Sequence, residues 1–581
     1  MAHEISTRAE PGSFRDRDSR VFVTPEGVFR ALSARGLEDF EALQATELFA
    51  DAVKEGDLVA TEIADVTATG LLPGTETAAV LRHERLPFIS YPYEWTFGML
   101  KDAALLHLEL LEEAMAEGLT MKDASPYNVQ WRGARPVFAD IGSFEVLRRE
   151  EPWIGYRQFC TLFLYPLMLQ AYLGVPFHPW LKGSLEGIEP TQMAALMKGH
   201  RGKGLTTHVK LHARLERRYA TANRKEVKQE LSSAGFKPEI VQANLRKMRK
   251  LVGAMTWRAG QTAWTEYGQD NRGYEEADQR AKHDFVAAAA ERAKPRLAWD
   301  LGTNDGAFAR LIAPHAEFVV ASDFDHETVE ALYQSLKDEG NAKILPLVVD
   351  LTDPSPGRGW RGLERSRLED RGRPDLTLSL ALIHHLSITR NVPVDEVVDW
   401  LASLGGTHVV EFPLREDKMV QTLLNAKRDE SHPDYDLAYF EAALGGRFEI
   451  VNRLELGTRV LFEAVARRLE KLQVPWIELR EPRLPTSGGA VPSDLVSPAM
   501  RPLYSGRIVI NSDGYWCDSH RRLIDDDADA VSIGRPFIAN PDLVKRIALG
   551  APLNEGDSST YYSGGAQGYV DYPELDEAQA A

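Results

Sequence analysis

A glycine turn between an apolar run and a helical pattern constrains this chain more than any other feature. The run Leu-Ala-Trp-Asp-Leu at 297–301 leads into the pattern Asp300-x-Gly302-x-Asn304-x-Gly306. A strand that passes through a glycine turn into a helix is how an open α/β sheet presents backbone N–H groups to a nucleotide-like ligand. Glycine in the turn also lets a ligand approach without meeting a Cβ atom. The sequence therefore predicts a cofactor loop here.

Three more apolar runs follow the loop, and polar residues come directly after each. These are 318–322 followed by Asp323, 344–349 followed by Asp350, and 375–382 followed by the pair His384 and His385. In an open parallel sheet the carboxyl ends of the strands share one edge, where ligands bind, and the acid after the second strand reaches a ribose diol. We expect Asp323 to be that ribose acceptor. The alternative is a Rossmann-like domain whose edge polar groups are only structural.

With these residues in view, residues 257–468 resemble a class I S-adenosylmethionine-dependent methyltransferase. The resemblance implies a Rossmann-like core with S-adenosylmethionine as cofactor. It assigns the loop residues Asp300, Gly302, Asn304 and Gly306 to the first motif, Asp323 to the ribose, and Asp350 to the adenine side. Two strand-like runs, 448–456 and 458–465, are parted by Gly457. They predict the reversed final hairpin that distinguishes these enzymes from dinucleotide folds.

A narrower resemblance links the segment to a bacterial group labelled nodulation-type methyltransferases. It is carried by the Ala-Leu-Ile-His-His-Leu run from 381, by Val-Glu-Phe-Pro from 410, and by four residues before the loop, namely Trp264, Tyr267, Tyr274 and Lys282. That group's name specifies no substrate. A small-molecule acceptor with an oxygen or nitrogen nucleophile is the predicted substrate class.

Such an acceptor needs a base where its nucleophile is protonated. His384 and His385 follow the strand that faces the acceptor in this family, and Glu411 ends the next apolar run. A histidine with an ordinary pKa of about 6.5 accepts a proton at neutral pH. These three residues are the candidate bases, with a structural role as the alternative for the histidines. No metal site is predicted.

Length and composition limit the remaining possibilities. A chain of 581 residues exceeds what one hydrophobic core supports, so several domains are expected. Its two cysteines, Cys160 and Cys517, support neither a disulfide framework nor a zinc site. The start lacks an apolar signal core and no run is long enough to span a bilayer, which predicts a cytoplasmic protein. A net charge of −18 argues against nucleic-acid binding.

One region departs from this acidic balance. Residues 198–250 carry fifteen lysines and arginines with few acids between them. We expect a basic helical connector at 181–256. A solvated helical surface is the simpler interpretation. The alternative is a basic strip that holds an anionic substrate near the methyl donor.

The first 180 residues resemble a kinase-like α+β fold. Asp123 and Asn128 have the spacing of a kinase catalytic loop, and Asp140 begins Asp-Ile-Gly after the next apolar run. In kinases such residues supply a catalytic base and magnesium ligands. Met121, however, stands where the catalytic-loop histidine usually lies, and Arg30, with Glu47 as its proposed partner, stands for the strand lysine. Because arginine does not replace that lysine, we expect a kinase-like scaffold without kinase activity.

The last part of the chain, 469–581, changes character again. Strand-like runs at 476–480, 506–511 and 530–533 alternate with helical ones, which is typical of a (β/α)8 barrel. These residues are similar to the C-terminal end of old yellow enzyme flavoproteins. That resemblance assigns Asp513, Gly514, Gly534 and Arg535 to a flavin phosphate cradle.

Only about three strands of such a barrel are present, which predicts a partial (β/α)8 fragment without a complete reductase site. An incomplete parallel sheet exposes unpaired edges. We expect the fragment to pack on the rest of the chain, to self-associate, or to be a fusion remnant. The sequence thus predicts a multidomain α/β methyltransferase. The alternatives are a kinase-like phosphotransferase or a non-catalytic scaffold, and a flavin-dependent reductase is the least favoured.

Overall fold

The computed structural model describes most of the chain. The described residues are 9–24, 26–65, 77–147, 153–219, 238–257, 276–428, 432–467, 476–480, 497, 500–501, 504, 506–511, 528–533, 535–557 and 572–575. They form two compact units. The first comprises the chain to residue 391 with 407–432 and 453–463, and the second comprises 392–406, 433–452 and 464–581.

The first unit begins with an antiparallel sheet of four strands. Its order is β1 (Ser19–Thr24), β2 (Gly27–Leu32), β4 (Ala79–His83) and β3 (Thr61–Ile63). Between β2 and β3 lie helices α1 (Ala34–Gln44) and α2 (Glu47–Glu55). Each begins at a hydroxyl cap, because Ser33 and Thr46 accept bonds from the backbone N–H groups of Gly36 and Phe49.

The core of this N-terminal region forms around α3 (Phe97–Ala116), which is apolar on most sides and largely buried. Two short antiparallel pairs follow it, β5 (Leu119–Met121) with β8 (Phe144–Val146) and β6 (Val129–Arg132) with β7 (Arg135–Phe138). The next helices are α4 (Tyr156–Phe159), α5 (Tyr165–Leu173), α6 (His178–Gly183), α7 (Pro190–Leu196), α8 (Leu211–Tyr219) and α10 (Pro238–Gly253).

Part of the basic segment packs directly on this core. Helix α10 lies along α3, and its Arg246 and Arg249 pair with Glu112 of α3. The expected boundary at 180/181 falls inside α6. These described basic residues therefore belong to the packed N-terminal region.

A seven-stranded sheet follows, in the order β11-β10-β9-β12-β13-β15-β14. The strands are β9 (Leu297–Leu301), β10 (Phe318–Asp323), β11 (Ile344–Val348), β12 (Leu376–Ser379), β13 (Thr407–Pro413), β14 (Phe448–Leu456) and β15 (Arg459–Ala466). The pairs β10–β11, β9–β10, β9–β12 and β12–β13 are parallel. Two residues join β14 to β15, as the sequence predicts for a final hairpin, and β15 lies between β13 and β14.

Helices lie between most of these strands along the chain, as in other α/β folds. They are α12 (Glu276–Ala293), α13 (Ala307–Ile312), α14 (His326–Asp338), α15 (Val394–Leu404), α16 (Lys418–Asn425) and α17 (Leu437–Arg447). Asp325, two residues after β10, caps α14 by accepting from the N–H groups of Glu327 and Thr328. The strand order reverses beside β9, so the carboxyl ends of β9, β10 and β12 border the position where ligands bind in such sheets.

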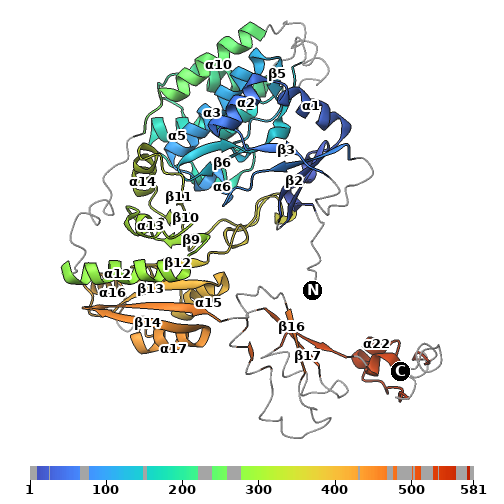
Figure 1. Ribbon diagram of the computed structural model, residues 1–581, viewed down its shortest axis with the longest axis vertical. Coiled ribbons are helices and arrows are strands. Elements are labelled where there is room, and N and C mark those ends of the chain that lie inside the picture. Colours follow the sequence, from blue (N-terminus) through green and yellow to red (C-terminus); the bar gives the residue numbers. More distant parts are fainter. Residues whose placement is uncertain are drawn as a thin grey trace. The chain divides into compact units, whose positions relative to one another are not determined.

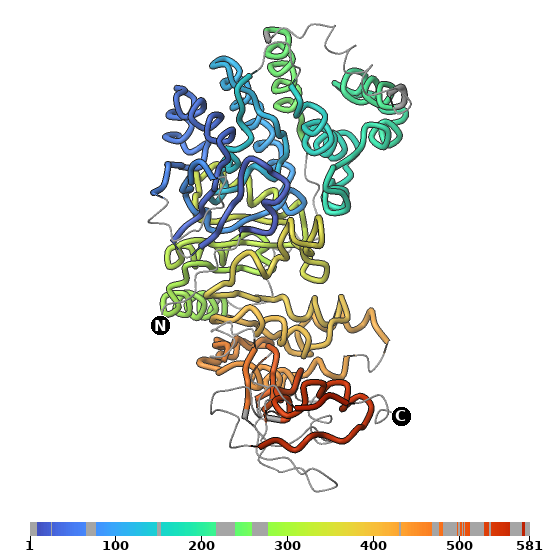
Figure 2. The backbone as a smooth tube through the Cα atoms, turned by 90° about the vertical axis from the view of Figure 1, so that its right-hand side faces the viewer, coloured from blue at the N-terminus to red at the C-terminus, as the bar shows by residue number. Residues whose placement is uncertain are grey.

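Within the first unit, the N-terminal region packs against the sheet region, as both backbone views show (Figures 1 and 2). The N–H of Gly98 in α3 donates to Glu330 of α14 at 2.8 Å, and Tyr333 of α14 donates to Asp102 of α3 at 2.6 Å. A Cβ atom at position 98 would lie 2.4 Å from the Gln334 amide. Glycine there allows the two helices to approach this closely.

The second unit contains a small parallel sheet, β16 (Trp476–Arg480), β17 (Arg507–Asn511) and β18 (Ala530–Ser532). Tyr504, Ile508, Ile510 and Ala528 form its core. Helices α21 (Arg535–Ala539) and α22 (Leu543–Leu549) come next. The chain thus has a multidomain α/β fold. Among the described helices, none combines the length and apolarity needed to cross a bilayer.

Candidate functional site

A cavity of about 380 Å³ opens at the carboxyl ends of β9, β10, β11 and β12. Its volume is in the range that encloses a small-molecule ligand. Many of the predicted cofactor residues line it together. Its lining includes Lys282, Asp300, Gly302, Thr303, Asn304, Phe308, Asp323, Phe324, Asp350, Leu351, Thr352, Leu380, Ala381, Leu382, His385, Leu386, Arg390 and Arg459.

The glycine loop turns back on itself at the edge of the cavity. Gly302 and Asn304 adopt φ angles of +72° and +50°, and Gly306, at +76°, is the N-cap residue of α13. A Cβ atom at position 306 would lie 2.6 Å from a methyl group of Leu332. Glycine is therefore required at 306 both for the left-handed backbone and for the packing of α13 against α14.

Asp300 holds the glycine loop in place through a hydrogen bond with Thr303. Its carboxylate is 2% exposed and accepts a hydrogen bond of 2.6 Å from the Thr303 hydroxyl. Burial raises the pKa of Asp300 to about 6, and the nearby Asp323 charge also raises it, against the lowering effect of Thr303. Asp300 therefore titrates closer to neutral pH than an ordinary aspartate does.

Asp323 ends β10 and closes the loop. Its two carboxylate oxygens accept from the backbone N–H groups of Asn304 at 3.0 Å and Asp325 at 3.1 Å. Burial raises the pKa of Asp323, and these backbone bonds oppose that shift. Each carboxylate oxygen has a second lone pair, so Asp323 can still accept a ligand hydroxyl.

Asp350 lies on the next strand end. Its Oδ1 accepts from the Thr352 hydroxyl at 2.6 Å, and its Oδ2 pairs with Arg390 at 3.1 Å. Although burial raises the pKa of Asp350, the Thr352 hydrogen bonds and the Arg390 charge lower it overall. Asp350 is therefore ionised at neutral pH and faces the cavity beside Thr352.

Glu411, a predicted base candidate, is fully buried in β13 and bound by two cations. Its carboxylate lies 2.6 Å from Lys282 Nζ and 3.0 Å from Arg459 Nη1. It also accepts from the N–H of Ala381 at 2.9 Å, and Ala381 has the unusual φ of +50°. The glutamate therefore fixes two cationic side chains and one loop residue at the cavity wall.

The adjacent histidines differ in their surroundings. His385 lines the cavity, whereas His384 is fully buried and is not among the lining residues. Among the described residues, neither ring nitrogen of His384 has a hydrogen-bond partner. Burial lowers the pKa of both histidines, that of His385 to about 4, with the Arg459 charge adding to the effect. Both rings are therefore neutral at neutral pH.

Two buried cations, Lys282 and Arg459, are among the lining residues that were not predicted as site residues. Lys282 comes from α12 and lies 5.0 Å from the ring centroid of Phe308, and Arg459 comes from β15, where it also pairs with Asp417 at 2.9 Å. Lys282 had appeared only as part of the pattern before the loop. Nothing in the sequence near Arg459 indicates the site, because its contacts depend on the order of the sheet.

The kinase-like residues also come together, in the N-terminal region. Asn128 donates to Ser143, whose hydroxyl donates to Asp140 at 2.8 Å. Arg30 pairs with Asp140 at 2.7 Å, and not with the exposed Glu47 that the sequence had suggested. A cavity lined by Arg30, Lys122 and Gly142 is only about 20 Å³, and Asp140 is not among its lining residues.

Several predicted residues lie outside the described part of the chain. They are Trp264, Tyr267 and Tyr274 before the loop, and Asp513 and Gly514 with Gly534 in the proposed phosphate cradle. The side chain of Arg535 is likewise not among those described.

Comparison with known proteins identifies the family. Over 450 residues, which are 76% of this chain and 92% of the relative, the sequence is 32% identical to nodulation protein NoeA of Rhizobium meliloti (strain 1021). The chain belongs to the NoeA family. The similarity to NoeA extends well beyond a single domain, since it covers more than twice the length of the 257–468 segment. No family model matches the chain.

Other known proteins match smaller parts of the chain. A C-terminal part is 37% identical over 116 residues to the 12-oxophytodienoate reductase-like protein of Solanum lycopersicum, and it spans only 30% of that protein. Among solved structures, the N-methyltransferase NodS of Bradyrhizobium japonicum WM9 aligns with 33% of this chain and 98% of its own. That alignment has 14% identity and a TM-score of 0.25.

Proposed function

We propose that the chain is an S-adenosylmethionine-dependent methyltransferase that acts on a small-molecule acceptor. One observation carries the proposal: the glycine loop, Asp323 and Asp350 line a single cavity at the switch point of the sheet. An acid after each of two neighbouring strands suits a ligand with a ribose and a base. The resemblance of residues 257–468 to class I methyltransferases supports the same donor.

The described residues fit such a donor. Asp323 would accept from the ribose hydroxyls, Asp350 and Thr352 would border the adenine, and the backbone at 302–304 would face the amino-acid portion. When bound, S-adenosylmethionine would supply a methyl group on a sulfonium: a nucleophile would bond to the methyl carbon in line as the carbon–sulfur bond breaks, and the neutral thioether S-adenosylhomocysteine would leave. The protein's part is to orient the two reactants and to exclude water.

His385 is our candidate for the base that accepts the proton of the acceptor's nucleophile. It lines the cavity, and burial lowers its pKa to about 4, so its ring is neutral at neutral pH. A base of that pKa is weak, so it would take the proton only as the nucleophile becomes acidic on attacking the methyl group. His384 packs behind it, with ring centroids 4.0 Å apart. Glu411 is engaged by Lys282 and Arg459, so we assign it to holding these cations and not to proton transfer.

For the N-terminal region we propose a kinase-like scaffold without phosphoryl transfer. The Arg30 guanidinium lies 2.7 Å from Asp140, the residue at the position of a magnesium ligand, so a cation of the protein itself already neutralises this carboxylate. The C-terminal sheet of three parallel strands is proposed to be a partial barrel and a possible site of self-association. A flavin-dependent reaction has less support, because the matched reductases extend far beyond the shared part.

A thermal-shift experiment separates these functions, because a ligand that binds only the native state raises Tm. Purified protein is heated with S-adenosylmethionine, with ATP and Mg²⁺, or with flavin mononucleotide. We expect a higher Tm with S-adenosylmethionine alone. A shift with ATP that Asp140→Asn abolishes would favour the phosphotransferase, and no shift with any ligand would favour a scaffold.

A further inference from the structure

One wall of the cofactor cavity belongs to a single hydrogen-bonded turn. Asp350, Leu351 and Thr352 line the cavity. The N–H of Asp353 donates to the carbonyl of Asp350 at 3.0 Å, and the N–H of Thr352 donates to Asp350 Oδ1 at 2.9 Å. These bonds couple the four residues 350–353, so a displacement of Asp353 is transmitted to Asp350.

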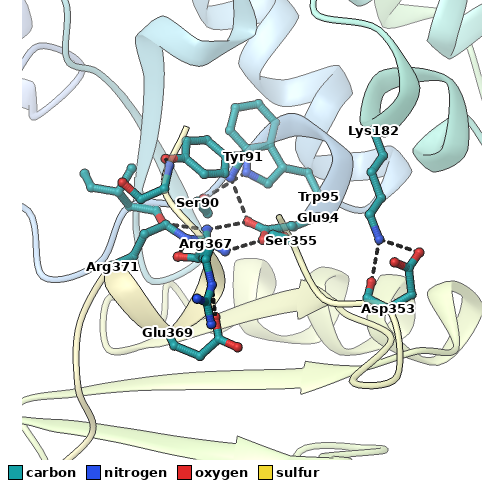
Figure 3. A network of polar contacts seen from close by, with 12 residues as sticks. Ser90, Tyr91, Glu94, Trp95, Lys182, Asp353, Ser355, Arg367, Glu369 and Arg371 are labelled. Atoms are coloured by element: carbon teal, nitrogen blue, oxygen red, sulfur yellow. Dashed lines mark hydrogen bonds and ion pairs between the residues drawn. The ribbon is translucent and has the colours of Figure 1, made fainter. Parts of the chain in front are cut away.

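The N-terminal region holds the far end of this turn. Lys182, in α6, places its Nζ 2.6 Å from Asp353 Oδ2, and it also donates to the Asp353 carbonyl. Figure 3 shows the ammonium group between these two oxygens of Asp353. An ammonium that binds both a side chain and the backbone of one residue fixes the position of the main chain as well as that of the carboxylate.

A second anchor lies two residues further on. The Ser355 hydroxyl donates to Glu94, whose carboxylate forms two bonds with Arg371, at 2.7 and 2.5 Å. The Glu94 and Arg371 side chains are each 2% exposed, and the Arg371 guanidinium lies 4.6 Å from the centroid of the Tyr91 ring (Figure 3). The segment after the turn is therefore held to the N-terminal region by the Ser355–Glu94 hydrogen bond, and the buried Arg371 ion pair fixes the Glu94 carboxylate.

The two anchors share one support. His178, the first residue of α6, bonds the carbonyl of Trp95 through Nε2 at 2.9 Å. Trp95 is fully buried and directly follows Glu94. Lys182 and Glu94 are thus carried by a common, tightly packed part of the N-terminal region.

We propose that Lys182 is a positioning residue for the methyl-donor site, because it holds the 350–353 turn so that Asp350 faces the cavity. The inference rests on the proposed function, since it concerns the same cavity. The N-terminal region then contributes to donor binding without touching the donor. Burial raises the pKa of Asp350, whereas the Thr352 hydrogen bonds, the Arg390 charge and then the Lys182 charge lower it.

The test compares three lysine variants by calorimetric titration with S-adenosylmethionine. Lys182→Met is expected to raise Kd by about two- to fivefold, the effect of losing a partly exposed ion pair, and Lys182→Arg to restore binding. Lys101→Met is the matched control, because it removes an ammonium that bonds the Met255 carbonyl. Adding Ser355→Ala to Lys182→Met should raise Kd about tenfold over wild type. These variants avoid the folding defect expected from breaking the buried Glu94 pair.

A second readout needs no ligand. Hydrogen exchange at the backbone amides of Leu351, Thr352, Asp353 and Ser355 should be faster in Lys182→Met than in wild type or Lys101→Met, with Tm of the three proteins nearly equal. Wild-type protein that does not bind S-adenosylmethionine would contradict the proposed function. Wild type that binds, together with a Lys182→Met variant of unchanged affinity and unchanged exchange, would overturn the role of Lys182.

Discussion

The carboxylate of Glu411 lies 2.6 Å from the Nζ of Lys282, a residue 129 positions away in sequence. Arg459 binds the other carboxylate oxygen at 3.0 Å. The Glu411 side chain is 0% exposed, and those of Lys282 and Arg459 are 6% and 7% exposed. A buried carboxylate thus fixes two cations at the wall of the candidate donor site, and loss of that carboxylate leaves both less compensated.

Glu411→Gln should therefore destabilise the protein. Removing one partner of a buried ion pair costs about 3–5 kcal/mol, because the remaining buried charges are less compensated. Urea denaturation of the variant would measure the loss. The control is Glu455→Gln, which breaks a largely exposed pair with Arg453 and should change stability by less than about 1 kcal/mol. Equal stabilities of the two variants would contradict the proposed role of Glu411.

The raised pKa of Asp300 should make the stability of the protein depend on pH. Its folded-state pKa of about 6 exceeds the ordinary value of 3.8, so the folded state holds the proton more tightly than the unfolded state. The contribution of Asp300 is fully present below about pH 4 and falls as the pH rises to about 6, by roughly 2–3 kcal/mol. Asp300→Asn should abolish this difference. Parallel stability profiles of the two proteins between pH 4 and about 7 would refute the assignment.

The lowered pKa of His385 should make the stability change with pH in the opposite direction. Its folded-state pKa of about 4 lies below the ordinary 6.5, so its contribution to stability is present above about pH 6.5 and is lost as the pH falls to about 4. NMR of histidine-labelled protein, with the His385 signal assigned by His385→Gln, would give the titration midpoint. A midpoint near 6.5 would show that the ring is solvated and outside the buried cavity wall.

Gly133 tests the packing of the N-terminal region on the sheet region. Its φ is +58°, and a Cβ atom there would lie 2.4 Å from the carbonyl oxygen of Asn341. Gly118 has a φ of +84° with open space around it. Gly118→Ala should cost about 1 kcal/mol from backbone strain alone, and Gly133→Ala about 3 kcal/mol, because it adds a clash with main chain. Equal Tm changes in the two variants would show that the two regions do not pack as described.

The loop residues could be predicted because their roles are local. The turn at 302–306 needs glycine, and the acids at 323 and 350 follow apolar strands, so strand order in a parallel sheet suffices to bring them together. Sequence also indicated the final hairpin, through the break at Gly457. These features depend on residues that are near neighbours in the chain.

The rest of the site depends on distant contacts. Lys282, Glu411 and Arg459 meet only because α12, β13 and β15 are brought together by the folded sheet. Likewise, Arg30 finds Asp140 across 110 positions of sequence, and the local pattern pointed instead to Glu47. Ion pairs between distant residues leave no periodic pattern in the sequence. The sequence therefore indicated the candidate bases but not which of them faces the cavity.

Calorimetric titration of S-adenosylmethionine into wild-type protein and into Asp323→Ala tests the central claim most directly. The account predicts saturable binding by the wild type and a loss of at least about tenfold in affinity in the variant, because Asp323 would no longer accept from the ribose. The control is Asp305→Ala, in the same loop but not among the cavity-lining residues, and it should bind normally. Folded wild-type protein that gives no binding heat at several temperatures would contradict the account.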